Sequence, residues 1–311
     1  MTEKTKILSI KTHKVFLTVY MPDAVPAAIV QINHGLAEHS LRYQVFARYL
    51  CQKGYAVYVH DHPGHGQTAG NKSKAGHLPW EKGWDSMLDV IHGINKSIRK
   101  NHPGIPVFLF GHSMGSLLSR HYNAIYPMYF KGIILSGTSN PDLTSLKASL
   151  TLVKVMSFFK GEKHKSRWLN NFFYRKFNKA IAHPKTDYDW LSSDPVEVEK
   201  YLQDEFCGFQ LSLGFFKNLL QGTMQMLKTE RKLRFRKNLA SLIISGKHDP
   251  VGQNGKEPRM LQEKYKQQGY FNTHLRLIEG RHELLNEIPT IRIQTYEVIA
   301  AWIESKLKGN F

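Results

Sequence analysis

The fold of this chain is decided by one stretch of sequence, Phe108-Leu109-Phe110-Gly111-His112-Ser113-Met114-Gly115-Ser116. It begins as an apolar strand, passes through the pattern Gly-x-Ser-x-Gly and continues into the helical pattern of residues 117–125. A serine on so sharp a turn has a strained backbone, so the residues two positions away on each side must be glycines. The turn lifts the hydroxyl clear of the sheet and points a helix N-terminus at the charge that forms during nucleophilic attack. The stretch predicts Ser113 as a nucleophile in an elbow that also contains Gly111, His112 and Gly115.

A serine nucleophile needs a base and an orienting acid, which in this architecture follow in the order Ser, Asp or Glu, His. Asp249 stands just after the apolar run Leu242–Ile244, and His282 just after the run His274–Ile278. Both side chains are therefore expected at the carboxyl edge of the sheet, together with Ser113. We predict Asp249 as the acid and His282 as the base; the alternatives are a capping or turn role for Asp249 and a surface role for His282.

An oxyanion hole in such an enzyme uses the backbone amide of the residue after the nucleophile and one from the loop after an early strand. The first is the amide of Met114. The loop Asn33–His39 occupies the second place, and Leu36 is the best candidate for the donor. Since the donor is a backbone N–H, the side chain of Leu36 matters little.

Apolar, β-branched runs recur along the chain and predict buried strands of a parallel sheet. They are Ala28–Ile32, Tyr55–Val59, Val107–Phe110, Gly132–Leu135, Leu242–Ile244 and His274–Ile278. Helical apolar stripes separate several of them, as in Ser40–Lys53 and Trp84–Arg99. This alternation predicts an α/β fold with a mostly parallel, doubly wound sheet.

The alternation stops after Leu135 and resumes at Leu242. Between them the chain shows helical stripes, and a structureless loop of that length is improbable. We predict a catalytic core formed by residues 1–138 and 239–311, interrupted by a helical cap, or lid, formed by residues 139–238.

Composition limits the remaining choices. The 311 residues carry a net charge of +18, with 41% hydrophobic and 12% aromatic residues, which excludes disorder as the main state. No apolar stretch approaches a membrane-spanning length, and the N-terminus lacks the pattern of a signal peptide. Two cysteines far apart, Cys51 and Cys207, indicate no disulfide framework or metal knuckle. These features predict a cytoplasmic protein.

The sequence resembles the α/β-hydrolase family of monoacylglycerol lipases and bacterial lysophospholipases, a group of serine-aminopeptidase-like hydrolases. The matching segments are 34–43, 61–66, 111–115, 246–251 and 280–283. The resemblance implies a mobile cap over a serine-hydrolase core that cleaves the acyl ester of a single-chain lipid, a monoacylglycerol or a lysophospholipid. It assigns Ser113, Asp249 and His282, with the amides of Leu36 and Met114, the roles given above, and requires no metal or organic cofactor.

Half of the net charge lies in residues 147–185, which hold ten Lys or Arg against one acid. A charge run is most often a solvated face. The alternative that we favour is a peripheral, interfacial surface at an anionic inner membrane face, and no nucleic-acid motif accompanies the charge. Its predicted residues are Lys165, Arg167, Trp168, Phe172, Phe173, Arg175, Lys176, Phe177 and Lys179.

Competing functions remain open from the residues alone. The same three residues serve a carboxylesterase, a thioesterase or an aminopeptidase, and a non-catalytic lipid-binding module is the alternative of another class. The run His60-Asp61-His62-Pro63-Gly64-His65 resembles a metal-ligand cluster, but no second cluster completes it. We expect structural roles for these histidines and no metal site, and the sequence predicts no oligomeric state.

Overall fold

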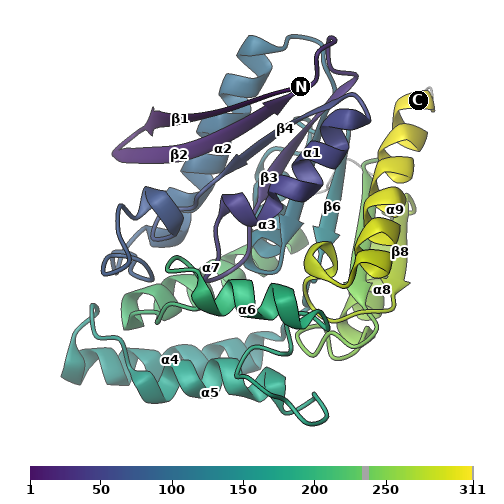
Figure 1. Cartoon of the computed structure of the whole chain (residues 1–311). Coiled ribbons are helices and arrows are strands. Elements are labelled where there is room, and N and C mark those ends of the chain that lie inside the picture. Colours follow the sequence, from purple (N-terminus) through teal and green to yellow (C-terminus); the bar gives the residue numbers. More distant parts are fainter. Residues whose placement is uncertain (233–237, 310–311) are drawn as a thin grey trace.

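A central sheet organises the molecule (Figure 1). The computed structural model describes residues 1–232 and 238–309, and within them the sheet has eight strands in the order β1-β2-β4-β3-β5-β6-β7-β8. From β4 to β8 all neighbouring strands are parallel. The predicted α/β class with a mostly parallel sheet is confirmed.

The parallel strands are those that the apolar runs predict, and each extends beyond its run at one or both ends. Their bounds are β3 (Ala28–Asn33), β4 (Tyr55–His60), β5 (Val107–His112), β6 (Gly132–Ser136), β7 (Ala240–Gly246) and β8 (Thr273–Ile278). Every residue of β3 to β7 is buried, as expected of strands covered by helices on both faces.

The two N-terminal strands were not predicted from the sequence. β1 (Thr2–Ile10) and β2 (His13–Met21) form an antiparallel hairpin, and β2 also pairs antiparallel with β4. β1 is almost wholly exposed, so it lacks the apolar pattern of the inner strands. The sequence pattern of a buried strand is present in β2, because Val15–Tyr20 is a run of mostly apolar or β-branched residues. All of them are buried in the structure.

Helices cover both faces of the sheet. One face carries α1 (Gln44–Gln52) and α9 (Pro289–Lys308), and the other carries α2 (Gly83–Asn101), α3 (Met114–Ile125) and α8 (Lys256–Gln267). The predicted helix Ser40–Lys53 is a 3-10 turn, η1 (Ser40–Tyr43), followed by α1, and two further such turns are η2 (Gly66–Thr68) and η3 (Leu284–Asn286).

The described residues between β6 and β7, 137–232 and 238–239, contribute four more helices, which lie together at one end of the sheet (Figure 1). They are α4 (Leu143–Lys160), α5 (Arg167–Asn178), α6 (Pro195–Gln203) and α7 (Leu213–Lys232). Three begin at residues whose side chains accept a backbone N–H of the first turn, namely Asp142, Ser166 and Asp194. Residues 233–237 of the predicted cap lie outside the described residues.

Helix α7 joins this group to the rest of the fold. It packs against both α4 and α3. In the α3 contact the buried guanidinium of Arg120 donates two hydrogen bonds of 2.8 Å to Glu230 of α7, whose oxygens also accept bonds from Lys264 and Tyr265 of α8. Among the described residues, no helix combines the length and the apolar character that crossing a bilayer requires.

Candidate active site

Ser113 lies between β5 and α3 with φ +50° and ψ −118°. This backbone conformation is unfavourable for a residue with a Cβ, as the sequence pattern predicts. The turn is held because the N–H of Ser113 donates to Ser136 O at 2.9 Å and its own carbonyl accepts the N–H of Ser116 at 2.9 Å. The serine is partly exposed and therefore accessible to a substrate.

The glycines on either side of Ser113 are needed for close backbone approach. A Cβ at Gly111 would lie 2.4 Å from Gly115 O, and a Cβ at Gly115 would lie 2.1 Å from Asn33 O. Neither distance is tolerated by real side chains. The Gly-x-Ser-x-Gly spacing thus lets β5, α3 and the end of β3 pack together around the turn.

His282 and Asp249 form a buried pair next to this turn. The His282 ring donates its Nδ1 proton to Asp249 Oδ1 at 3.0 Å, and both side chains are almost completely buried. Burial alone would lower the pKa of His282, but the attraction of Asp249, with Glu283 and Glu38, outweighs it and raises the pKa above 6.5. Burial would raise the pKa of Asp249, and the contact with His282 lowers it below 3.8.

The loop after β3 lies against the serine. A Cβ added to Gly35 would stand 3.3 Å from the Cβ of Ser113, and Leu36, Met114, Ser113 and His282 line one cavity. The structure therefore brings together all five residues for which the sequence predicts a role in the reaction. Four of them line the cavity, and the fifth, Asp249, contacts His282.

A buried ionic network that sequence reasoning missed lies beside these residues. Arg42 donates to both oxygens of Glu283 at 2.5 and 2.7 Å and to Glu38 at 3.3 Å, while Tyr43 donates to Glu38 at 2.8 Å. Glu38 also accepts the N–H of Gly35, which ties the network to the loop beside Ser113. The sequence pattern that could have predicted part of this network is the four-residue spacing between Glu38 and Arg42 in the segment 34–43.

The pKa values of the two acids of this network shift in opposite directions. Burial raises the pKa of Glu38 in spite of Arg42. Burial also opposes ionisation of Glu283, but the two-pronged contact with Arg42 outweighs it and lowers the pKa to about 2. Arg42 is thus largely neutralised by the residue that follows His282.

The segment between α5 and α7 contacts the residues of the site. The N–H of His282 donates to Trp190 O at 3.4 Å, and that of Glu283 donates to Leu191 O at 2.7 Å. The ring of Trp190 lies 5.1 Å from that of His282. From α6, the hydroxyl of Tyr201 donates to Ala37 O at 2.9 Å. The helices of the insertion therefore contact the loops that carry the site.

The cavity has a volume of about 580 Å³ and two chemically distinct parts. Around Ser113 its lining is polar, with His112, Glu38 and Glu283. Apolar side chains from α4, α5, α7 and the segment after α5 line another part of it: Leu146, Val153, Leu169, Phe173, Phe177, Trp190, Leu219 and Leu220. Further polar residues also line the cavity, among them Ser139, Asn140, Asp142, Ser145, Ser149, Gln253, Lys256 and Glu257. A hollow of about 350 Å³ between α8 and β8 contains none of the predicted site residues.

The residues of the predicted interfacial surface lie in two environments that overlap. Phe172, Phe173, Lys176 and Phe177 line the cavity, with the ammonium of Lys176 4.7 Å from the ring of Phe177. Lys165 donates to Ala75 O at 2.7 Å and is partly buried. Six residues of the predicted surface are exposed, and two of them, Phe172 and Lys176, also line the cavity: Arg167, Trp168, Phe172, Arg175, Lys176 and Lys179.

The histidines of segment 60–65 pack together below the loop after β3. His34 Nε2 accepts the N–H of His62 at 2.9 Å, and His60 Nε2 lies 3.1 Å from His62 Nδ1. Burial lowers the pKa of His34, His60 and His62 well below the ordinary value, and it lowers the pKa of His65 to about 4. They are neutral, mutually packed side chains that support the loop.

The fold, the strained serine and the His–Asp pair define this chain as an α/β-hydrolase of the serine type. The chain belongs to the serine aminopeptidase S33 family, whose sequence profile matches residues 24–289. It is a hydrolase of the esterase and lipase kind, as its similarity to individual proteins shows.

Two curated proteins illustrate that similarity. Monoglyceride lipase of Homo sapiens is 27% identical over 293 residues, which cover 94% of this chain and 87% of that protein. Monoacylglycerol lipase of Mycolicibacterium smegmatis is 26% identical over 300 residues, which cover 94% of each.

Solved structures of hydrolases are also similar to this chain. A thermostable carboxyl esterase from Bacillus coagulans, crystallised in complex with glycerol, matches with a TM-score of 0.87, 26% identity and 99% coverage of both chains. Monoacylglycerol lipase of Paleococcus ferrophilus matches with a TM-score of 0.68 at 22% identity, covering 94% of this chain and 99% of that one, and supports the fold.

Proposed function

We propose that this enzyme hydrolyses the ester of a monoacylglycerol through an acyl-enzyme on Ser113. The observation that carries the proposal is the single cavity in which Ser113 and His282 share a polar end that opens into an apolar chamber under α4 and α5. An acyl chain suits the chamber because apolar surface gains about 25 cal/mol per Å² on leaving water.

In the proposed mechanism His282 is the general base. Its Nδ1 proton is engaged by Asp249 at 3.0 Å, so Nε2 is the nitrogen left to accept the proton of Ser113. The hydroxyl oxygen attacks the ester carbonyl, and the amides of Leu36 and Met114 stabilise the oxyanion. His282 then donates the proton to the leaving glycerol oxygen, and a water molecule activated in the same way releases the fatty acid.

A neutral head group fits the polar end better than a phosphate. Glu38 and Glu283 line it, and Arg42, the cation beside them, is bound to Glu283 through both of its terminal nitrogens. A phosphodiester there would face a carboxylate without a free guanidinium to pair with. Hydroxyl groups can instead donate to carboxylate oxygens. This favours monoacylglycerol over lysophospholipid, in line with the names of the similar proteins.

The nucleophile is tested by Ser113→Ala. We expect ester hydrolysis to fall by at least ~10³-fold and labelling by a fluorophosphonate probe to disappear. The control is Ser97→Ala on α2, outside the cavity. Turnover of Ser113→Ala close to the wild-type rate would refute the assignment.

The substrate is tested by comparing kcat/KM on monoacylglycerol, lysophosphatidylcholine, a short p-nitrophenyl ester and an aminoacyl amide. We expect the highest value for monoacylglycerol. A preference for lysophosphatidylcholine would make the enzyme a lysophospholipase, and a preference for the amide would make it an aminopeptidase.

We further propose that residues 139–238 act as a cap whose outer surface docks on an anionic membrane, from which the substrate is drawn. The support is an exposed aromatic group that extends the predicted residues: Phe158 (84% exposed) and Phe159 (77%) of α4, and Trp168 and Phe172 (62% each) of α5. The ring planes of Trp168 and Phe172 lie 14° apart with centroids at 5.9 Å. These helices lie farthest from the sheet (Figure 1).

A further inference from the structure

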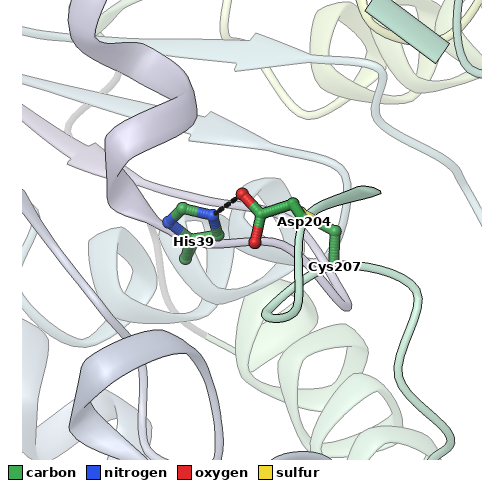
Figure 2. Close-up of side chains that lie close together, drawn as sticks. All are labelled: His39, Asp204 and Cys207. Atoms are coloured by element: carbon green, nitrogen blue, oxygen red, sulfur yellow. Dashed lines mark hydrogen bonds and ion pairs between the residues drawn. The ribbon is translucent and has the colours of Figure 1, made fainter. Parts of the chain in front are cut away.

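A group of metal-binding side chains lies outside the proposed reaction chemistry, between the loop after β3 and the end of α6. It consists of His39, Asp204 and Cys207, and Figure 2 shows the three side chains together. One ligand atom from each residue lies within 4.8 Å of the others. His39 Nε2 donates to Asp204 Oδ2 at 2.8 Å, so two of the three ligand atoms are already in contact.

Burial and charge favour a cation at this point. His39 and Cys207 are buried, whereas the Asp204 side chain is 31% exposed and leaves a route from solvent. Glu38 and Glu283 lie close enough to act electrostatically on Cys207, as does Arg42. With Asp204, three carboxyl groups thus oppose one guanidinium around the thiol.

We propose that His39, Asp204 and Cys207 bind a thiophilic divalent cation of the Zn²⁺ class. An imidazole nitrogen, a carboxylate oxygen and a thiolate are the three ligand types that zinc takes in proteins, and a water molecule completes the tetrahedron. With zinc bonds of about 2.0 to 2.3 Å, neighbouring ligand atoms stand roughly 3.5 Å apart. Side-chain adjustment of about 1 Å is therefore enough to close the site.

Binding exchanges protons for the metal. The Cys207 thiol loses its proton to solvent as the S–Zn bond forms. His39 Nε2 also gives up its proton, so that the neutral ring carries its proton on Nδ1, and the hydrogen bond from Nε2 to Asp204 is replaced by two metal bonds. Because binding releases the thiol proton, the apparent affinity for Zn²⁺ increases with pH.

The site joins two parts of the fold that meet above Ser113. His39 follows Glu38, which accepts the N–H of Gly35 beside the serine. In the segment after α6, Gly208 donates its N–H to Ala37 O at 3.0 Å. A metal ion on these ligands would clamp the segment after α6 to the loop that carries Leu36.

The test is metal binding by the full chain carrying Ser113→Ala, so that its outcome is independent of hydrolysis. Isothermal titration with Zn²⁺ should show one equivalent bound, more tightly at pH 8 than at pH 6. Titration with Co²⁺ should produce sulfur-to-cobalt charge-transfer absorption in the near ultraviolet, and saturating Zn²⁺ should raise the melting temperature.

Variants identify the ligands. Cys207→Ser should abolish the charge-transfer band, and Cys207→Ser, His39→Ala and Asp204→Asn should each weaken Zn²⁺ binding by ~10-fold or more. Cys51→Ser is the matched control, because Cys51 is the other buried thiol and lies on α1. The proposal is overturned by the absence of saturable binding, by a Co²⁺ spectrum without the thiolate band, or by a band that Cys51→Ser removes. The Co²⁺ spectrum of the parent protein decides the question even if a variant fails to fold.

Discussion

His282 is the residue whose protonation sets the activity proposed here. Its pKa is raised because the attraction of Asp249 and the neighbouring glutamates exceeds the effect of burial. Only the neutral imidazole can act as a base. The rate must therefore rise with pH through a pKa above the ordinary value of about 6.5.

Asp249→Asn provides a direct test of that cause. Without the carboxylate, burial dominates and the pKa of His282 falls, so the acid limb of kcat/KM moves to lower pH. The maximal rate should drop by on the order of 10³ to 10⁴-fold because the imidazole loses its orienting partner. The measurement is a pH–rate profile of both proteins, and an unshifted acid limb in the variant would contradict the assignment of His282.

Gly115 tests the packing around the elbow. Gly115→Ala places a Cβ 2.1 Å from Asn33 O, a backbone atom that cannot rotate away. We expect a loss of about 3 kcal/mol or more in the free energy of unfolding, measured by urea denaturation. Gly309→Ala is the control, since its added Cβ would lie 3.5 Å from the nearest atom and should change stability by less than about 0.5 kcal/mol. Equal losses in both variants would show that the close approach is not the cause.

At the scale of the elements, the contact between α3 and α7 is one of those that attach the insertion to the core. Arg120 and Glu230 are both fully buried there. Burial opposes the charge of Glu230, but Arg120 and Lys264 outweigh it and lower its pKa to about 2. Its stabilising contribution is present above the ordinary pKa of 4.5 and is lost as the pH falls towards 2.

Glu230→Gln leaves a buried guanidinium without its counter-charge. We expect the free energy of unfolding to fall by about 3–5 kcal/mol. The matched control is Glu263→Gln, which removes the exposed pair with Lys266 on α8 and should cost about 1 kcal/mol or less. Urea denaturation of both variants at pH 7 measures the difference, and losses of similar size would refute an anchoring role for the buried pair.

At the scale of the whole molecule, the net charge of +18 and the aromatic side chains of α4 and α5 lead to one expectation. Each Lys or Arg near an anionic surface adds about 1 kcal/mol, an attraction that salt screens. Binding to anionic vesicles should therefore exceed binding to neutral vesicles and weaken as salt is added.

The aromatic part is tested by replacing Trp168 and Phe172 together with Ala. Burying one such side chain in the interface contributes about 1.5–3 kcal/mol, so vesicle binding should weaken by ~10-fold or more. Phe271→Ala is the control, because Phe271 is 80% exposed but lies before β8, outside the insertion. Co-sedimentation with vesicles measures both, and an equal effect of the two changes would argue against docking through α4 and α5.

Sequence alone predicted the inner strands, the elbow and the residues now found around it. Those features are local: a buried strand is a short apolar run, and a strained turn demands glycines at fixed positions. The hairpin of β1 and β2 escaped prediction because β1 is exposed and so carries no apolar pattern. Similarly, the aromatic residues 168–177 form a single helical stripe in sequence. In the structure Phe173 and Phe177 line the cavity, Trp168 is exposed to solvent, and Phe172 lies at the cavity but remains 62% exposed.

The sequence by itself determined the α/β class and the order of Ser113, Asp249 and His282 along the chain, because each depends on a few neighbouring residues. Only the tertiary structure decided that Arg42 pairs with Glu283 and that Cys207 meets His39 and Asp204. Those partners stand up to 241 positions apart, and no local pattern encodes their contact. Their proximity arises when the sheet brings its loops to one edge and the insertion folds over them.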